Sequence, residues 1–194
     1  MFKKSYFIKK INSPLKASII RSFDVNKVGT PVDKLVGAIV GGTIKSGSIK
    51  IGDKIKIIPG IIKDNMSIPL TAVVETLKTE NTPLDVAYPG GLIGIGLSLD
   101  PSLSKEDKLV GNFIVSENDN SYTIFKKAKI SYNKYDELVE LKKDEYYVMM
   151  LGSTKRDIKV TSINNSKNEL CFANLSKSFI SSFFKKFSIL SPPI

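Results

Sequence analysis

The chain has 194 residues, of which 42% are hydrophobic, and it carries a formal net charge of +10. A hydrophobic content of this size supports a packed core and excludes a wholly disordered chain. The positive charge favours a polyanionic partner, with nucleic acid first and an anionic membrane face second. A basic chain can also simply be more soluble, which is the plainer alternative.

The sequence contains no histidine and a single cysteine, Cys171. The commonest general base and metal ligand is therefore missing, and neither an internal disulfide nor a multi-cysteine metal site can form. Cys171 lies in the apolar stretch ELCFANL, which indicates a buried thiol and not a nucleophile. We therefore predict no catalytic residue, no metal site and no cofactor in this chain, and a reducing, cytoplasmic location.

The basic residues are very unequal, because Arg21 and Arg156 are the only arginines among 29 basic side chains. Lysine is a point charge on a flexible stem and suits the neutralisation of phosphates. Bidentate reading of guanine edges prefers arginine. We therefore expect any RNA contact to involve the backbone or a chain end, and not sequence readout in a groove.

The chain begins with a lysine-containing segment, residues 1–13, which we predict to be a basic N-terminal arm and not a signal peptide. No apolar run reaches the length of a membrane span. From residue 14 onward, short β-rich runs alternate with Gly, Pro, Asn, Asp and Ser, a pattern typical of an all-β barrel or sandwich. The expected strands lie at 17–23, 36–44, 53–58, 69–77, 91–99, 108–115, 122–131, 145–151, 157–163, 169–175 and 182–190.

A polar stretch, SENDNS at 116–121, interrupts this series, and apolar residues resume after it. We therefore predict an all-β fold of two small antiparallel barrels, at 14–116 and 117–194. One short helical turn is expected in SLSKEDKL, with Ser104 and Asp107 spaced like a capping pair.

Four glycines fall within seven residues of YPGGLIGIGLSLDPSLS, residues 88–104. Their order, G-G-x-x-G-x-G, differs from the G-x-G-x-x-G of a dinucleotide loop, and Pro101 blocks the helix that such a loop must open. No Lys-Ser/Thr pair follows, as a Walker loop requires. The pattern favours a strand interrupted by glycine, where a bend or a ligand approaches the backbone.

A second motif, NKYD at 133–136, matches the guanine-specificity sequence N-K-x-D by its letters. A guanine pocket also needs a phosphate loop upstream, and the sequence has none. We interpret NKYD as a solvated turn.

Two stretches, residues 19–60 and 87–112, resemble the second domain of the gamma subunit of eukaryotic and archaeal translation initiation factor 2. Their segments SFDVNK and PGGLIG are closer to that family than to the looser pattern shared with elongation factor Tu. The later half is similar to the family's third domain through KISY, LKKDEYYVMMLGS and the position of Cys171. Val28 stands where the family usually has proline, and the C-terminal segment lacks the family's Arg-rich, Trp-containing end.

The resemblance implies a component of translation initiation factor 2 that helps bind methionyl initiator tRNA and partner subunits for delivery to the small ribosomal subunit. The family is a GTPase, but its GTP-binding domain, which holds GTP and magnesium, has no counterpart in this sequence. No enzymatic activity is therefore expected from this chain alone. The missing domain would be supplied in cis by a longer protein or in trans by another chain, or it has been lost. The alpha and beta subunits are the other expected partners, and no membrane is expected.

In the family, the wall between the GTP-binding domain and this barrel holds the aminoacylated end of the initiator tRNA. Glycine suits such a wall because a nucleotide can lie against bare backbone, and nearby lysines can neutralise acceptor-stem phosphates. The alternative is that the glycines only shape the barrel. The resemblance assigns the tRNA end to Gly41, Gly42, Gly90, Gly91, Gly94 and Gly96.

Loops of this barrel dock the alpha subunit in the family, and the loop FDVNKVGTPVDK joins the first two expected strands. The resemblance assigns this docking role to Asp24, Asn26, Lys27 and Asp33. The alternative is a solvated turn.

Two other classes of function stay open at this point. One is an RNA- or ribosome-binding β-barrel module related to elongation factors, without a GTPase switch of its own. The other is an enzyme. The SFDVNK loop favours the initiation-factor component over the RNA- or ribosome-binding module. The missing histidine, nucleophile signature and phosphate loop weigh against an enzyme.

Overall fold

The computed structural model describes residues 11–64, 66–80, 82–125, 127–131, 140–151, 153–165, 169–174, 179–180 and 188–189. These form two compact units. The first runs to Ile61 and continues over Pro69–Asp119, and the second comprises Ile62–Ile68 and the residues from Asn120 onward. Most of the predicted N-terminal arm and the whole NKYD motif lie outside the described residues.

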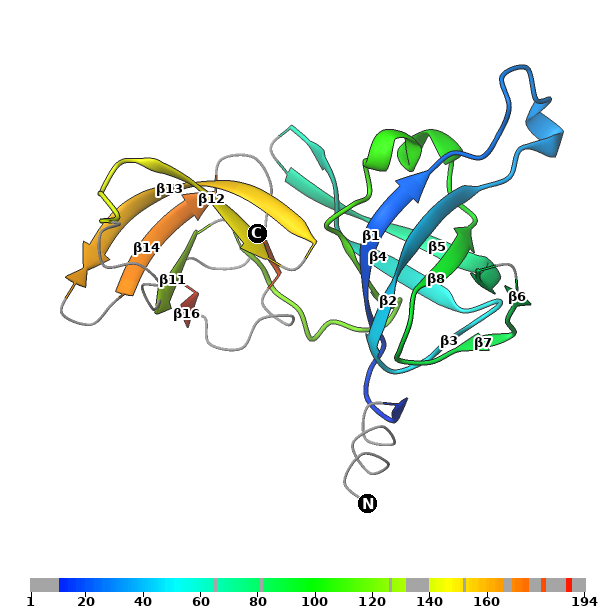
Figure 1. Cartoon of the computed structure of the whole chain (residues 1–194), viewed down its shortest axis with the longest axis horizontal. Helices are drawn as coiled ribbons and strands as arrows, with labels where there is room; N and C mark the ends of the chain where they lie inside the picture. Colours follow the sequence, from blue (N-terminus) through cyan, green and yellow to red (C-terminus); the bar gives the residue numbers. More distant parts are fainter. Residues whose placement is uncertain are drawn as a thin grey trace. The chain divides into compact units, whose positions relative to one another are not determined.

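The first unit is built from strands and short 3-10 turns (Figure 1). Its strands are rich in isoleucine and valine, whose branched side chains pack well on a pleated surface. The elements are β1 (Lys16–Phe23), η1 (Val32–Lys34), β2 (Ala38–Ser46), β3 (Ile49–Lys50), β4 (Lys54–Lys63), β5 (Met66–Thr79), β6 (Thr82–Pro83), β7 (Val86–Ala87), β8 (Ile93–Leu97), η2 (Pro101–Leu103), η3 (Lys105–Asp107) and β9 (Phe113–Ser116).

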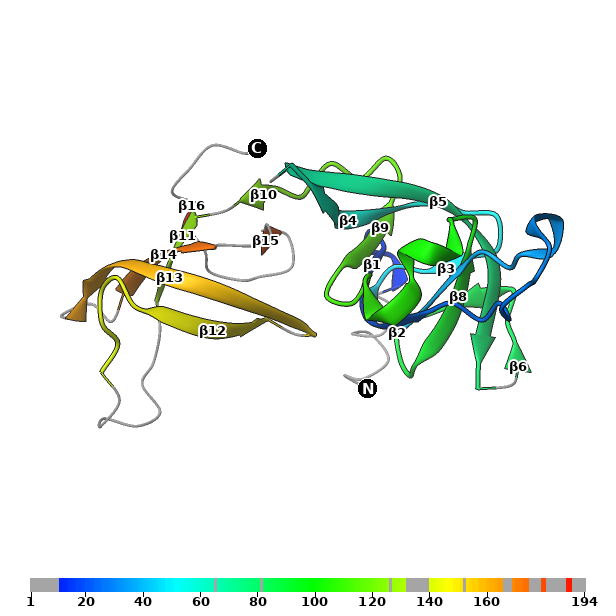
Figure 2. The same cartoon turned by 90° about the horizontal axis from the view of Figure 1, so that it is seen from above.

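Six of these strands close into a barrel. Their order is β4-β9-β1-β2-β8-β5, and β5 also pairs with β4, so that the sheet meets itself. Closure satisfies the backbone groups of what would otherwise be two exposed sheet edges. Figure 2 shows the long β4–β5 hairpin that forms the seam.

The core of the barrel follows from the alternation of side chains along each strand. On β2, Ala38, Val40 and Ile44 are buried, and on β8, Ile93 and Ile95 are buried. All belong to the core of the unit except Ala38, which is buried but lies outside that cluster. Gly41 on β2 and Gly94 on β8 alternate with these buried residues and face outward, so the sequence of β2 and β8 decides which groups the barrel presents to a ligand.

The segment after β8 crosses back to β1 and is held there by buried polar groups. The hydroxyl of Ser104 donates to the carbonyl of Phe23 (3.0 Å), and the backbone N–H of Leu109 donates to the hydroxyl of Ser22 (3.0 Å). The short helical turn expected in this segment is present as η2 and η3. The expected capping role of Ser104 is wrong, because its side chain makes no cap hydrogen bond, and Asp100 caps η2 instead.

The second unit is a five-stranded antiparallel sheet in the order β12-β13-β14-β11-β16, accompanied by the pair β10–β15. It curls into a half-barrel (Figure 2). Its core contains Ala128, Ile158, Leu170 and Phe172. The prediction of an all-β fold of the translation-factor type is confirmed. The strands are β10 (Ile124–Phe125), β11 (Lys127–Ser131), β12 (Tyr146–Leu151), β13 (Thr154–Asn164), β14 (Glu169–Asn174), β15 (Phe179–Ile180) and β16 (Ser188–Ile189).

Among the residues that the structure describes, no helix has the length and apolarity needed to cross a membrane.

Candidate nucleic-acid interface

Two of the predicted glycines face each other across neighbouring strands. β2 and β8 run antiparallel, and their register places Gly41 directly opposite Gly94. Directly opposed residues of an antiparallel pair point to the same face of the sheet. Because Val40 and Ile95 are buried in the core, their chain neighbours Gly41 and Gly94 lie on the outer face.

Each of these glycines is also paired with a cation on the strand at its other side. Gly41 is paired with Arg21 on β1, and Gly94 is paired with Lys78 on β5. The outermost strands of this row are separated by three inter-strand spacings, or roughly 14 Å. We call these four residues the glycine row: Arg21, Gly41, Gly94 and Lys78.

A second row lies beside the glycine row on the same face. Phe23, two residues from Arg21 on β1, is paired with Ile39, and Ile39 is paired with Gly96. The Phe23 side chain is 40% exposed. Phe23 thus offers an exposed ring two residues from Arg21, on the same face as Gly41 and Gly94. Such a ring can stack a base while a nearby cation neutralises a phosphate.

The glycines of β2 and β8 differ in what a side chain would meet. A Cβ on Gly41 would lie 3.5 Å from the Cβ of Arg21, and a Cβ on Gly94 would lie 3.8 Å from the carbonyl oxygen of Lys78. Both distances are ordinary van der Waals contacts. A side chain would therefore fit at either position, and the surface of the glycine row is bare backbone only because both residues are glycine.

Gly42 and Gly96 have a different role. A Cβ on Gly42 would overlap the backbone carbonyl oxygen of Ser18, and a Cβ on Gly96 would overlap the hydroxyl of Thr76. Gly42 is opposite Ile93 and is buried. The close approach of β1 to β2 therefore requires glycine at position 42, which makes Gly42 part of the barrel architecture and not of the outer floor.

Gly90 and Gly91 form the turn that leads into β8. Their φ angles are +130° and +57°, and a Cβ on either would meet nothing within 4 Å. These backbone angles lie in the region that glycine adopts without strain. The turn therefore needs glycine for its conformation, while both positions are exposed.

Arg21 is held at the end of the glycine row by an ion pair. Its Nε lies 3.2 Å from Oδ1 of Asp107, and the side chains are 69% and 42% exposed. The same oxygen accepts a hydrogen bond from the backbone N–H of Ser22 at 2.8 Å. The pKa of Asp107 is lowered mainly by this backbone donor and further by Arg21, against an opposing effect of partial burial.

The predicted docking loop between β1 and β2 projects from the barrel (Figure 1) and is braced by Asn26. The Asn26 side chain donates to the carbonyl of Val36 and accepts from the Val36 N–H, both at 2.8 Å. Asp24 accepts hydrogen bonds from the backbone and side chain of Asn26. Asp24 and Asn26 therefore shape the loop. The sequence alone did not distinguish this structural role from a role in docking.

The tip of this loop presents apolar side chains to solvent. Val28 is fully exposed and Val32 is 85% exposed. Lys27 and Asp33 are also exposed, and the Lys27 carbonyl accepts from the backbone and hydroxyl of Thr30. These exposed valines leave apolar side chains on a braced loop available to a protein partner.

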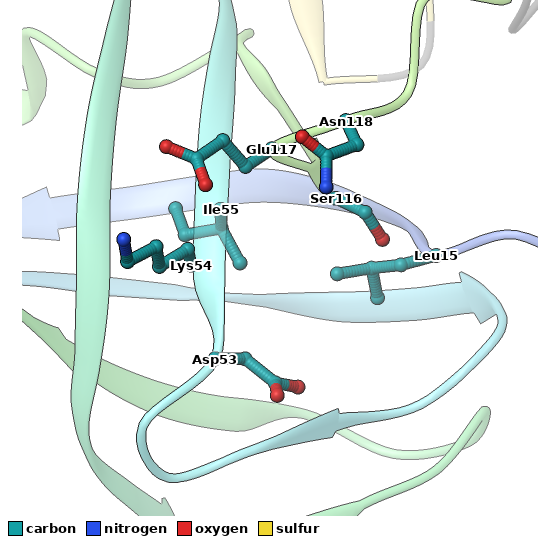
Figure 3. Close-up of a pocket in the computed structure, with 7 residues that line it drawn as sticks. All are labelled: Leu15, Asp53, Lys54, Ile55, Ser116, Glu117 and Asn118. Atoms are coloured by element: carbon teal, nitrogen blue, oxygen red, sulfur yellow. The ribbon is translucent and has the colours of Figure 1, made fainter.

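A separate pocket of about 340 Å³ lies where β4 begins and β9 ends (Figure 3). Charged groups of both signs line it, namely Asp53, Lys54 and Glu117. Asp53 already accepts a hydrogen bond from the Lys50 N–H at 2.9 Å. This mixed charge does not favour a polyanion, and the pocket shares no residue with the glycine row.

The sequence identified the glycines of the row but missed its cations. Arg21 could have been found, since it is one of only two arginines and lies in the stretch that resembles the initiation-factor family. Lys78 carried no such signal, because it is one of many lysines and its neighbours across the sheet depend on register.

The fold and the sequence together define the class of protein. Residues 37–110 match the family model for elongation factor Tu domain 2. The crystal structure of a bacterial selenocysteine-specific elongation factor is similar in fold, with a TM-score of 0.64 and 19% identity. The similarity covers 89% of this chain and 25% of the elongation factor. The chain is thus a β-barrel protein of the translation-factor class.

Curated relatives narrow the class to one family. The gamma subunit of eukaryotic translation initiation factor 2 from Encephalitozoon cuniculi is 37% identical over 163 residues, which cover 79% of this chain and 37% of the relative. The gamma subunit of translation initiation factor 2 from Pyrococcus furiosus is 46% identical over 107 residues, or 53% of this chain and 26% of the relative. The chain is a member of the family of initiation factor 2 gamma subunits and spans about a quarter to a third of these relatives' length.

Proposed function

We propose that the chain acts in translation initiation by holding the 3′ end of methionyl initiator tRNA against the outer face of its first barrel. The observation that carries this proposal is the glycine row, in which bare backbone on two adjacent strands is bounded by Arg21 and Lys78. Glycine admits a nucleotide close to the backbone, the cations neutralise phosphates, and Phe23 offers a ring for stacking.

The braced loop between β1 and β2 would dock a protein partner, and in this family context we assign it to the alpha subunit. Its exposed valines and its flanking Lys27 and Asp33 support a protein contact over an RNA contact. The beta subunit and the small ribosomal subunit complete the expected set of partners, and delivery would take place in the cytoplasm. A GTP-binding domain, in cis or in trans, would supply GTP, magnesium and the hydrolytic switch.

Binding of methionyl initiator tRNA tests this proposal, measured by filter binding with the GTP-binding partner present. We expect Gly94→Leu to weaken binding, because the side chain would cover the floor while the Cβ itself fits. Gly94→Ala should weaken binding less and should melt like the wild type. Equal affinity for initiator tRNA, deacylated tRNA and unrelated RNA would instead support the RNA-binding module without initiator specificity.

Lys78→Ala provides an electrostatic test of the same surface. Removing one phosphate contact should reduce the salt dependence of binding by about one unit of slope. Lys50→Ala is the matched control, since Lys50 is also exposed but lies on β3, outside the glycine row. Equal loss of slope in both variants would argue against a site on this face.

A further inference from the structure

Arg21 stands at the edge of the glycine row, yet its side chain is long and largely exposed. A free side chain of this kind loses conformational freedom when it binds a ligand, and this cost lowers affinity. An interaction that holds the guanidinium in place before binding reduces the cost. Asp107 makes such an interaction, through Oδ1 to Nε at 3.2 Å.

The ion pair leaves the binding end of Arg21 available. It engages Nε, and among the described residues the two terminal amino groups make no hydrogen bond or ion pair. A guanidinium held through Nε can still direct its terminal amino groups at a phosphate, which is a favourable geometry for charge-assisted hydrogen bonds.

Asp107 is itself firmly anchored. Its carboxylate accepts the Ser22 N–H at 2.8 Å, and its carbonyl accepts the N–H of Val110 at 2.9 Å. The next turn is tied to the same strand, because the Leu109 N–H donates to the hydroxyl of Ser22. Asp107 therefore holds Arg21 with a carboxylate whose own position is set by the backbone of β1.

We propose that Asp107 is a positioning residue: it orients Arg21 of the glycine row for a phosphate at the 3′ end of a single-stranded RNA. This inference rests on the proposed function, since that function supplies the ligand. It adds that the cation is oriented before the ligand arrives, and that a residue outside the barrel strands controls affinity.

The variant Asp107→Gly removes the carboxylate and suits the left-handed backbone at this position, where φ is +57°. Asp107→Asn keeps an oxygen acceptor, and asparagine also tolerates this backbone region. With a fluorescent single-stranded RNA ending in CCA, we expect Asp107→Gly to weaken binding by about fivefold. Asp107→Asn should stay within about twofold of the wild type, because its amide oxygen can accept both hydrogen bonds that the carboxylate oxygen of Asp107 accepts.

A double-mutant cycle separates orientation from a general structural effect. In the Arg21→Ala background, Asp107→Gly should cause no further loss, because it acts only through Arg21. An equal loss in both backgrounds would overturn the positioning role. Asp100→Asn is the matched control, because Asp100 lies in the same segment but bonds to Ser102 and not to Arg21.

Nitrogen-15 relaxation of the arginine Nε–H groups tests orientation without any RNA. The chain has only two arginines, so the Arg21 signal can be assigned against Arg156. The order of the Arg21 Nε–H should fall in Asp107→Gly, and an unchanged order would overturn the positioning role alone. The relaxation data can also show that Asp107 orders Arg21 while the wild type fails to bind the RNA. That result would overturn both the proposed ligand and the role of Asp107 in binding it.

Discussion

At the scale of single residues, the glycines of this barrel divide into those that leave space and those that permit packing. Gly41 and Gly94 have room for a Cβ, so the space over their backbone is available to a ligand. Gly42 has none, because β1 passes too close. Adjacent glycines on one strand thus have opposite consequences, and the reason is the alternation of strand faces.

This difference predicts the outcome of two matched substitutions. Gly42→Ala should destabilise the protein by about 1–3 kcal/mol, because the added methyl group must displace backbone in a packed interior. Gly41→Ala should leave stability unchanged or raise it slightly, because alanine restricts the unfolded chain at a compatible position. Urea unfolding followed by circular dichroism measures both. Similar destabilisation by the two variants would contradict the assigned faces of β2.

Asp107 predicts a pH dependence of stability. Its folded-state pKa lies below the ordinary value of 3.8, so the ionised carboxylate stabilises the folded protein above that pH. The contribution is lost as the pH falls through the folded-state pKa. The stability difference between the wild type and Asp107→Asn should therefore shrink as the pH is lowered below 3.8, as measured by urea midpoints. A difference that stays constant to the lowest pH would show that the charge of Asp107 does not stabilise the fold.

At the scale of elements, the loop between β1 and β2 owes its shape to one amide side chain. Asn26 bonds to both backbone groups of Val36 and so closes the base of the loop. The 3-10 turn η1 within the loop buries none of its residues. The loop is therefore ordered by hydrogen bonds, while its apolar tip stays exposed.

We expect Asn26→Ala to loosen this loop without unfolding the barrel. Hydrogen exchange at the Val36 amide should accelerate by about tenfold or more, because its acceptor is lost. Global melting should change little, since the loop adds nothing to the core. Thr30→Val is the control, because it removes only the bond from the Thr30 hydroxyl to the Lys27 carbonyl. Equal acceleration in both variants would show that Asn26 has no special role in the loop.

At the scale of the whole molecule, the first barrel has a complete core of its own. Its buried cluster runs from Leu15 to Ile114 and contains no residue of the second unit. A closed sheet with its own core is able to fold independently.

A fragment ending at Asp119 tests this independence. We expect a cooperative thermal transition and a strand-dominated circular dichroism spectrum, because the fragment retains all six barrel strands. The full-length chain, measured under the same conditions, is the reference. A broad, non-cooperative transition of the fragment would show that the barrel depends on the rest of the chain.

The sequence by itself determined the fold class and much of the strand pattern. Runs such as ASIIRSF and DKIKII predict strands because branched side chains and alternating polarity suit a pleated surface, and β1 and β4 lie there. It also placed the glycine stretch on a strand, as β8 shows for Gly94 and Gly96. These features are local, so each can be derived from neighbouring residues alone.

Only the tertiary structure decided which residues meet across the sheet. The pairing of Gly41 with Gly94, and of each with a cation, depends on the register of four strands that are spread over residues 16–97. The contact of Asp107 with Arg21 spans 86 residues and replaces the capping role expected from local spacing. A one-residue slip in register would reverse the face of every side chain, and register is set by closure of the whole barrel, which no local pattern contains.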